Sequence, residues 1–318
     1  MRRFAPTLCC VACVVVAAFV LLPARAFAQE AHAAAQETAQ APVDFITPHI
    51  TDSHHLELPW FLPPFHKELE LPRFAPVHVG ALTVDLSPTK HVIFLLFAAG
   101  LCLWIVVGSA RAHARQTAAQ GTPRGVAAAV EAVVLYLRSE IILPNVGPHG
   151  EAFVPFCLTL FFFILFGNLL GLLPWGSTAT GNISVTATLA IVSFFVIEIA
   201  GMRALGWGYI KTIVYWPDDM PLLMKAPMTF IMTPIEIIGK IVKPFALMLR
   251  LFANMTAGHF VILALLGLVF IFGSWPVAAG SVVFVVFMML LELLVAVLQA
   301  YIFALLTSVF IGMMQHAN

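Results

Sequence analysis

The sequence predicts an all-α membrane protein with about five transmembrane helices and one interfacial amphipathic helix. The last two crossings are expected to form a long, strongly tilted antiparallel hairpin. Apolar residues make up 61% of the 318 residues, and Asp, Glu, Lys and Arg make up only 10%, well below the roughly 25% of soluble domains. The mean hydropathy is +0.98. The 16 basic residues balance the 16 acidic ones, so we expect no nucleic acid partner.

Residues 1–28 are typical of a secretory signal peptide. Arg2 and Arg3 supply the positive end, residues 8–22 are apolar and uncharged, and residues 26–28 (AFA) form a small-residue cleavage pattern. An uncleaved membrane helix is the alternative interpretation. The apolar core is shorter than the roughly 20 residues that span a bilayer, which favours cleavage.

Residues 29–90 are predicted to form an external, acidic arm rich in proline and histidine. They hold 8 acidic residues against 3 basic ones, together with 6 histidines. His54 and His55 could bind a metal with His49 and His66, but helical i, i+4 spacing and cysteine ligands are missing. We therefore expect a solvated, partly ordered arm, with no metal site and no cofactor.

Residues 91–318 are predicted to form the transmembrane domain, in which the apolar segments are residues 91–109, 152–173, 183–202, 228–272 and 277–314. The first three match one crossing each. The last two would be about 68 and 57 Å long as helices, so they must tilt, kink or project from the bilayer. Pro234 and Pro244 offer places for the fourth segment to bend.

The basic residues of the loops predict the orientation. Residues 110–150 and 203–227 contain Arg and Lys, whereas residues 174–182 and 273–276 contain neither. The positive-inside rule puts the two basic loops in the cytoplasm. With five crossings, the mature N-terminus is then external and the C-terminus cytoplasmic, and the signal peptide independently predicts the same orientation.

One further helix is expected to lie on the cytoplasmic membrane surface or against a partner. Thr122 and Pro123 are typical of a helix start. The apolar stripe that follows consists of Val126, Val130, Val133, Leu137 and Ile141, with charged residues on another face. A short packing helix within the subunit is the alternative.

Charged groups inside predicted crossings are costly and therefore mark candidate functional residues. The fourth crossing contains Glu236, Lys240, Lys243, Arg250 and His259, the fifth contains Glu292 and Gln299, and Glu198 lies near the cytoplasmic end of the third. Glu236, Lys243 and Arg250 are seven residues apart and so share a helix face. Asn254 follows one turn after Arg250. Such polar stripes indicate an aqueous or protein-filled groove.

The hairpin register predicts which of these groups lie at the same depth. The turn around residues 273–276 sets Glu292 level with His259, and Gln299 level with Arg250. At 1.5 Å per residue, the His259 level is roughly 10–14 Å outside the Arg250 level, and Glu236 is about 21 Å toward the cytoplasm.

This order of groups suggests two proton paths with a barrier between them. His and Glu can exchange protons, whereas Arg keeps a fixed positive charge. The structural alternative is that Arg250 pairs with Glu236, Glu292 or the backbone. Lys240 and Lys243 would then extend their amines to the cytoplasmic surface.

The residues around these charges closely resemble subunit a of F-type ATP synthases. The matching runs are residues 234–236 (PIE), 243–244 (KP), 250–255 (RLFANM), 257–258 (AG), 299–303 (QAYIF) and 168–174 (NLLGLLP). The resemblance covers about residues 45–316. It implies a proton-translocating stator subunit of the membrane F0 sector in a bacterial plasma (inner) membrane. Its implied partners are the c-subunit ring, the b-subunit peripheral stalk, other ATP synthase subunits and membrane lipid.

The resemblance also implies roles for individual residues. Arg250 matches the family's essential arginine facing the ring carboxylate, Gln299 its polar neighbour on the last helix, and Asn254 the asparagine one turn away. His259 and Glu292 match a pair that some members carry in the opposite order. Two departures are Met248, where a small residue is usual, and Gly171, which replaces an acid found in some relatives.

Two other functions remain open at this point. A stand-alone ion-coupled secondary transporter would account for buried charges, although inverted repeats are not evident in the sequence. A membrane scaffold could use the same charges to bind partners. The chain has no G-x-x-x-x-G-K-[ST] nucleotide motif, so we expect it not to be an enzyme by itself, with ATP chemistry on other subunits.

Overall fold

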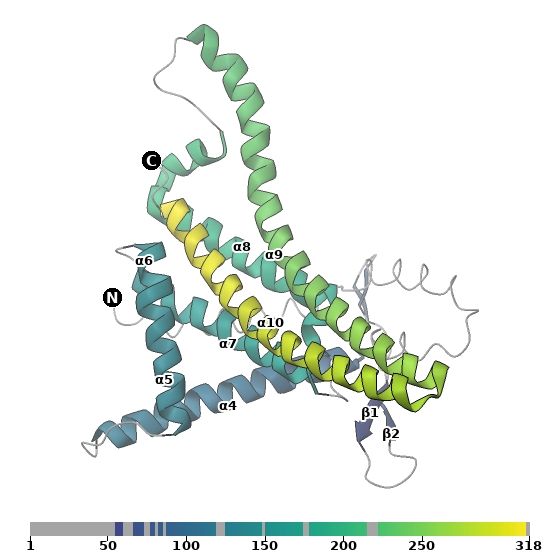
Figure 1. Cartoon of the computed structure of the whole chain (residues 1–318). Coiled ribbons are helices and arrows are strands. Elements are labelled where there is room, and N and C mark those ends of the chain that lie inside the picture. Colours follow the sequence, from purple (N-terminus) through teal and green to yellow (C-terminus); the bar gives the residue numbers. More distant parts are fainter. Residues whose placement is uncertain are drawn as a thin grey trace.

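The computed structural model describes residues 55–59, 66–72, 77–79, 82–84, 87–118, 125–147, 150–173, 178–214 and 222–315. The predicted signal peptide and most of the predicted arm lie outside these residues. The described residues contain five helices long and apolar enough to cross a membrane, which confirms the predicted class. These are α4 (Lys90–Ala118), α7 (Val154–Gly171), α8 (Ile183–Leu205), α9 (Leu222–Phe272) and α10 (Trp275–Gln315) (Figure 1).

Two short β-hairpins precede the first crossing helix. Strand β1 (His55–Pro59) pairs antiparallel with β2 (His66–Glu70), and β3 (Val77–Val79) pairs antiparallel with β4 (Leu82–Val84). These strands are an addition to the fold predicted from the sequence, in which frequent prolines argue against long strands. Both figures show β1 and β2 at the same end of the molecule as the turn between α9 and α10.

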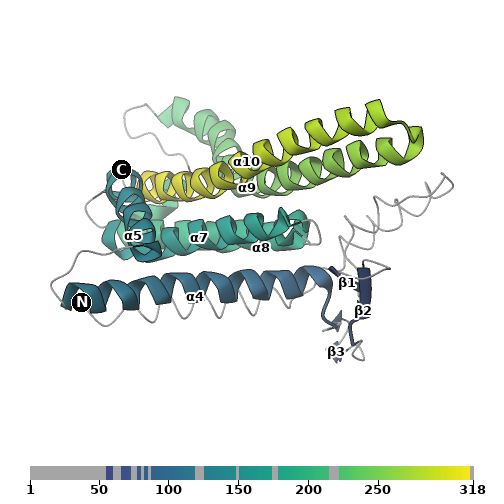
Figure 2. The same ribbon diagram turned by 60° about the horizontal axis from the view of Figure 1, so that its bottom comes forward.

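The helices form three layers, with α4 on one side, α7 and α8 in the middle, and α9 and α10 on the other side (Figure 2). Helix α4 buries one narrow stripe, because Leu95, Ala98 and Cys102 follow an i, i+3, i+7 spacing toward the bundle. On its outer face, Phe97 and Trp104 are 58% and 74% exposed. That apolar outer face is suited to lipid.

The predicted surface helix is present but begins later than expected. Thr122 and Pro123 lie outside the described residues, and α5 (Val126–Tyr136) starts directly after Gly125. Gly125 has a φ of 67°, a left-handed conformation that no right-handed helix running on from Pro123 could contain. The described helix therefore begins at Val126, and the expected start at Pro123 lies outside the described residues.

Helix α5 continues into the π-helix η1 (Leu137–Ile142) and the short helix α6 (Leu143–Val146). Of the predicted apolar stripe, Leu137 and Ile141 are buried, whereas Val126 is 68% exposed. The C-terminal end of the stripe is thus buried within the chain, Val130 packs partly against the core, and the N-terminal end is exposed. Both views show α5 running across one end of α4 and α7, at the end of the molecule where α10 terminates, as expected for an interfacial helix (Figures 1 and 2).

Helices α9 and α10 form the predicted long antiparallel hairpin. Helix α9 remains helical through Pro227, Pro234 and Pro244 and changes direction part-way along its length (Figure 1), as expected where proline removes a backbone hydrogen bond. The turn is made by Gly273, whose φ of 56° favours glycine. The N-terminal part of α9 projects away from the bundle, which accommodates a helix longer than the membrane is thick.

The core lies where α7, α8 and the C-terminal half of α10 meet. The fully buried Asn168 on α7 accepts a hydrogen bond from Thr180 Oγ1 at 2.7 Å, and its Nδ2 donates to the Ala296 carbonyl oxygen at 3.3 Å. Thr180 belongs to the 3₁₀ turn η3 (Ala179–Gly181). This network joins α7, η3 and α10, which is the frame that carries the polar groups described below.

Close backbone approach fixes the other end of α10. A Cβ at Gly312 would overlap the carbonyl oxygen of Asn145, so α10 touches the backbone of α6 at this point. The 3₁₀ turn η2 (Gly150–Ala152) links this region to α7. Helix α6, which follows α5 and η1 in the chain, is thereby held against the last crossing helix.

Candidate functional site

The structure brings His259 of α9 and Glu292 of α10 together part-way along the hairpin, about 21 Å from its turn at 1.5 Å per residue. His259 Nδ1 lies 2.8 Å from Glu292 Oε1, and Glu292 is only 3% exposed. The level deduced from the hairpin register therefore corresponds to a direct contact. Gly258 makes room for it, because a Cβ there would lie 2.6 Å from Glu292 Oε1.

Residues far away in the sequence hold the His259 ring. Its Nε2 lies 2.7 Å from the carbonyl oxygen of Gly171 and 2.9 Å from Thr178 Oγ1, while its Nδ1 is 3.1 Å from the Met255 carbonyl oxygen. Each ring nitrogen thus has an acceptor for its proton. The ring can gain or release a proton without leaving a buried donor unsatisfied.

Glu292 complements this ring chemically. Among the described residues, its Oε1 is buried and accepts no aligned hydrogen bond, although it lies at ion-pair distance from His259. A buried carboxylate oxygen needs a proton, a water molecule or a cation. A proton shared with His259 meets that need, so the pair can act as a proton-exchange site.

Arg250 and Asn254 lie on a different face of α9. Leu247, Leu251 and Met255 point into the core and are buried, whereas Arg250 and Asn254 are exposed. The described residues offer Arg250 no ion-pair partner, in contrast to the structural alternative of a pair with Glu236 or Glu292. Because a free cation on a membrane-embedded face is costly in lipid, this face requires water or another chain.

Gln299 does not meet Arg250 on that exposed face. It was expected at the same depth on α10, but its side chain is 6% exposed and lies within the packed part of the helix. The hairpin register determines the depth of each residue, but it does not determine the rotation of each helix about its own axis. Gln299 therefore lines the interior.

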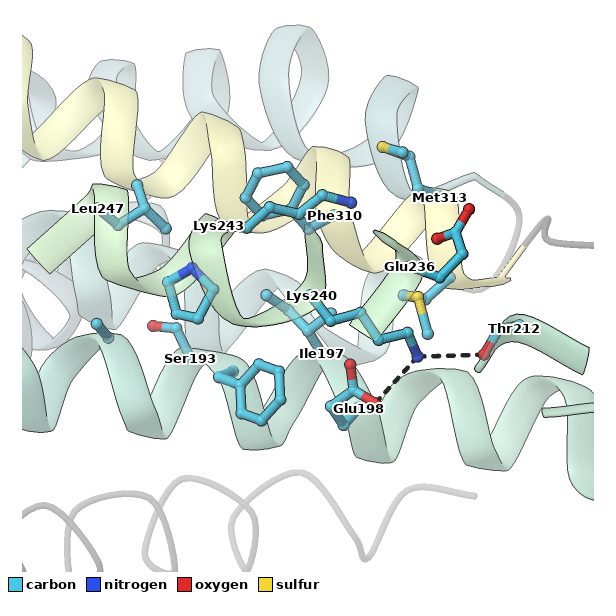
Figure 3. Close-up of a pocket in the computed structure, with 14 residues that line it drawn as sticks. Ser193, Ile197, Glu198, Thr212, Glu236, Lys240, Lys243, Leu247, Phe310 and Met313 are labelled. Atoms are coloured by element: carbon cyan, nitrogen blue, oxygen red, sulfur yellow. Dashed lines mark hydrogen bonds and ion pairs between the residues drawn. The ribbon is translucent and has the colours of Figure 1, made fainter. Parts of the chain in front are cut away.

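A cavity of about 370 Å³ opens on the opposite side of Arg250 from the His259–Glu292 pair, between α8, α9 and α10 (Figure 3). On α9 its lining runs from Leu247 to Glu236, and Glu236 itself is exposed. The deep end is three residues from Arg250 in the sequence. The cavity thus extends along α9 from Glu236 to Leu247, one turn before Arg250.

Lys240, on the wall of this cavity, does not extend to the surface. Its side chain is 14% exposed, and its Nζ lies 3.4 Å from Glu198 Oε2. It also donates to Tyr209 and Thr212 of the 3₁₀ turn η4 (Gly206–Thr212). The structural alternative, in which Lys240 extends its amine to the cytoplasmic surface, is therefore wrong for this residue. The second lysine, Lys243, lines the cavity with its Nζ 5.2 Å from the ring centre of Phe310.

Several of these site residues could not be identified from the sequence, because no motif or unusual residue type distinguishes them. Gly171 contributes a backbone oxygen, which any residue could supply. Thr178 precedes η3 and Thr212 ends η4, and the partners of both lie more than 25 residues away in the sequence. Glu198 and Lys240 could be singled out as buried charges, but their pairing depends on how α8 packs on α9.

Comparison with known proteins adds an independent line of evidence. The family model described as "ATP synthase A chain" matches residues 92–312. The chain is 46% identical over 250 residues to ATP synthase subunit a of Chloroherpeton thalassium, covering 77% of this chain and 73% of the relative. It is 40% identical over 299 residues to ATP synthase subunit a 2 of Chlorobaculum tepidum, covering 92% and 79%. It is 44% identical over 244 residues to ATP synthase subunit a of Myxococcus xanthus, covering 72% and 73%.

Proposed function

This chain belongs to the ATP synthase A chain family, and on that premise we propose that it is the proton-translocating stator subunit of the membrane F0 sector. In this proposal it provides two offset half-channels to a ring of c subunits, with Arg250 between them. ATP chemistry takes place on other subunits. Family membership favours this function over a stand-alone secondary transporter.

The observation that carries the proposal is the arrangement of three sites along α9. The buried His259–Glu292 pair lies nine residues, or about 14 Å, on one side of Arg250. Glu236, at the mouth of the cavity, lies fourteen residues, or about 21 Å, on the other side. Between them, Arg250 and Asn254 stand on an exposed face. Along α9, a pair of groups that can exchange protons and a carboxylate at a cavity thus lie on opposite sides of an exposed arginine.

This arrangement supports a rotary path for protons. A proton arriving from outside is passed by the His259–Glu292 pair to a carboxylate on the c-ring. After the ring has turned, that carboxylate releases its proton into the cavity that ends at Glu236. Arg250 attracts the ionised ring carboxylate and repels protons that would pass directly between the two half-channels. Asn254 supplies a neutral polar group one turn from Arg250 on the exposed face, and Gln299 supplies one at the depth of Arg250 inside the bundle.

The orientation and the remaining partners follow from the same proposal. The positive-inside rule places the loops on both sides of α5 and the end of α10 in the cytoplasm. In support, α5 and the end of α10 lie at one end of the molecule, opposite the β-hairpins and the α9–α10 turn. We place the protein in a bacterial inner membrane, with the b-subunit stalk and other ATP synthase subunits as partners. The arm of residues 29–90 is then external, following a cleaved signal peptide.

Reconstitution tests the proposal directly. The purified chain is placed in lipid vesicles alone, with the c-ring, or as the assembled ATP synthase, and proton flux is driven by a membrane potential. We expect flux only when the ring is present, because neither half-channel crosses the barrier at Arg250. Flux through the chain alone would instead identify a transporter. Absence of flux in the assembled complex would leave only a scaffold role.

A further inference from the structure

A partly buried ion pair on the wall of the cavity has no part in the mechanism proposed above. It joins Lys240 of α9 to Glu198 of α8, with Nζ 3.4 Å from Oε2 and both side chains 14% exposed. Figure 3 shows the Lys240 side chain reaching toward Glu198 and Thr212, away from Glu236. The pair therefore lies in the cavity and leaves Glu236 at its mouth free of Lys240.

The surroundings of Lys240 are built for the charged ammonium group. Its Nζ has three oxygen neighbours, which are Glu198 Oε2, the Tyr209 hydroxyl at 3.2 Å and Thr212 Oγ1 at 3.2 Å. An ammonium group has three N–H donors to match three acceptors, whereas a neutral amine has only two. The same Nζ lies 4.5 Å from the centre of the Tyr209 ring, a cation–π distance. The site thus offers a full set of hydrogen-bond acceptors to a lysine ammonium group.

A positive charge at Lys240 requires a nearby negative charge to balance it. The cavity is also lined by Lys243, so two positive side chains border it, opposed by Glu198 and Glu236. Once Glu198 neutralises the charge of Lys240, the remaining charged side chains of the cavity lining are Lys243 and Glu236, one positive and one negative. Without Glu198, Lys240 would add an uncompensated positive charge beside the route that a released proton must take.

We propose that Glu198 is the counter-ion of Lys240 and that this neutralisation keeps the cavity passable for protons. This inference rests on the proposed function, in which the cavity is the cytoplasmic half-channel. Glu198 acts by holding a negative charge beside Lys240, and it does not itself carry the transferred proton. A unit charge about 10 Å away at an effective dielectric of about 20 changes the local proton concentration by roughly tenfold, which sets the size of the expected effect.

Two substitutions of Glu198 separate its charge from its geometry. Glu198→Gln keeps an oxygen acceptor at nearly the same place but removes the negative charge. Glu198→Asp keeps the charge but shortens the side chain. We expect Glu198→Gln to lower ATP-driven proton pumping by roughly tenfold, with Glu198→Asp closer to the unmodified complex. The reverse order would show that geometry matters and charge does not, and would overturn the proposal.

A second pair of variants tests directly whether removing the charge of Lys240 offsets the loss of the charge of Glu198. Lys240→Met removes the cation and leaves a carboxylate that can take up a proton, so the loss should be small. In the double variant Glu198→Gln/Lys240→Met neither charge remains, and we expect pumping to return to within about threefold of the unmodified complex. If the pair only ties α8 to α9, the double variant will be at least as impaired as Glu198→Gln, and the counter-ion role is wrong.

The measurements use the assembled ATP synthase in vesicles, with ATP-driven acidification as readout and complex assembly checked for each variant. Glu151→Gln is the matched control, because it removes the same charge from an exposed pair with Arg138 and should change nothing. Arg250→Ala separates the two proposals. If Arg250→Ala abolishes pumping and Glu198→Gln has no effect, only the counter-ion inference fails. If Arg250→Ala pumps normally, the proposed function fails as well.

Discussion

His259 Nδ1 lies 2.8 Å from Glu292 Oε1, so the two helices of the long hairpin are joined through a pair of titratable side chains. The contact is possible because Gly258 precedes the histidine and presents no Cβ to the carboxylate. His259 is further held by the backbone of Gly171 and by Thr178. The pair is thus built from α9 and α10 but oriented by the α7–α8 connection.

We predict that His259 and Glu292 act as one proton-exchange unit. Replacing either should strongly reduce proton flux through the assembled complex, because the remaining partner alone cannot relay the proton. Exchanging the two residues, as His259→Glu/Glu292→His, should restore part of the flux. Proton flux in reconstituted vesicles provides the measurement. An exchanged variant no better than the single replacements would argue that the pair does not work as a unit.

A cysteine pair tests the proximity itself. His259→Cys/Glu292→Cys should crosslink on oxidation or with a short thiol reagent in the assembled complex. The matched control is His259→Cys/Leu293→Cys, since Leu293 is 43% exposed on another face of α10. Equal crosslinking of both pairs, or of neither, would contradict the contact seen here.

The space left by Gly258 should be functionally required. In Gly258→Ala, the new Cβ would lie 2.6 Å from Glu292 Oε1, so the carboxylate must move away from His259. We expect proton flux to fall by roughly tenfold or more, because small displacements of reacting groups are costly, while the complex still assembles. Gly239→Ala on the same helix is the control, since a Cβ there meets nothing within 4 Å. Similar losses in both variants would point to a general effect on α9.

Arg250 is predicted to be essential for coupling. Arg250→Lys should abolish ATP synthesis while assembly persists, because lysine lacks the guanidinium fork and can lose its proton in an apolar setting. Arg250→Ala should also abolish synthesis and should permit a passive proton leak. ATP synthesis and proton leak are measured in membranes containing the assembled complex. Normal coupled synthesis in Arg250→Ala would reduce the arginine to a structural residue.

The orientation can be tested without assaying function. Reporter domains fused after Arg115 and at Asn318 should both report the cytoplasm, because the basic loops direct the topology. A cysteine at Ser274, in the turn between α9 and α10, should react with an impermeant thiol reagent from the outside. An external reading at either fusion would require a different number of crossings or the opposite orientation.

Much of the hairpin could be deduced from the sequence. Two antiparallel helices of equal rise that turn around residues 273–276 set His259 level with Glu292, and the structure brings these two side chains into contact. The same reasoning could not decide that Gln299 is buried while Arg250 is exposed, because register does not fix the rotation of a helix about its axis. The depth of each residue along the hairpin could be predicted, but the side of the helix on which its side chain lies could not.

Other features depended on contacts that no local pattern reveals. The sequence favoured a helix start at Pro123. Gly125, however, has a φ of 67°, and the presence of a glycine does not by itself predict that it adopts a positive φ. Lys240 looked able to reach the membrane surface, but η4 folds over it and supplies two hydroxyl acceptors. In both cases the outcome was decided by the packing of segments distant in the sequence.

The one-sided burial of α9 has a consequence for biogenesis. Leu247, Leu251 and Met255 are covered by the chain itself, whereas Arg250 and Asn254 are left on the open side. A newly inserted subunit would hold this arginine against hydrocarbon, at a cost of roughly 2.5–3.5 kcal/mol or more. Orphan copies should therefore be recognised by membrane quality-control proteases, and the lifetime of the subunit in the cell should depend on how quickly its partner arrives.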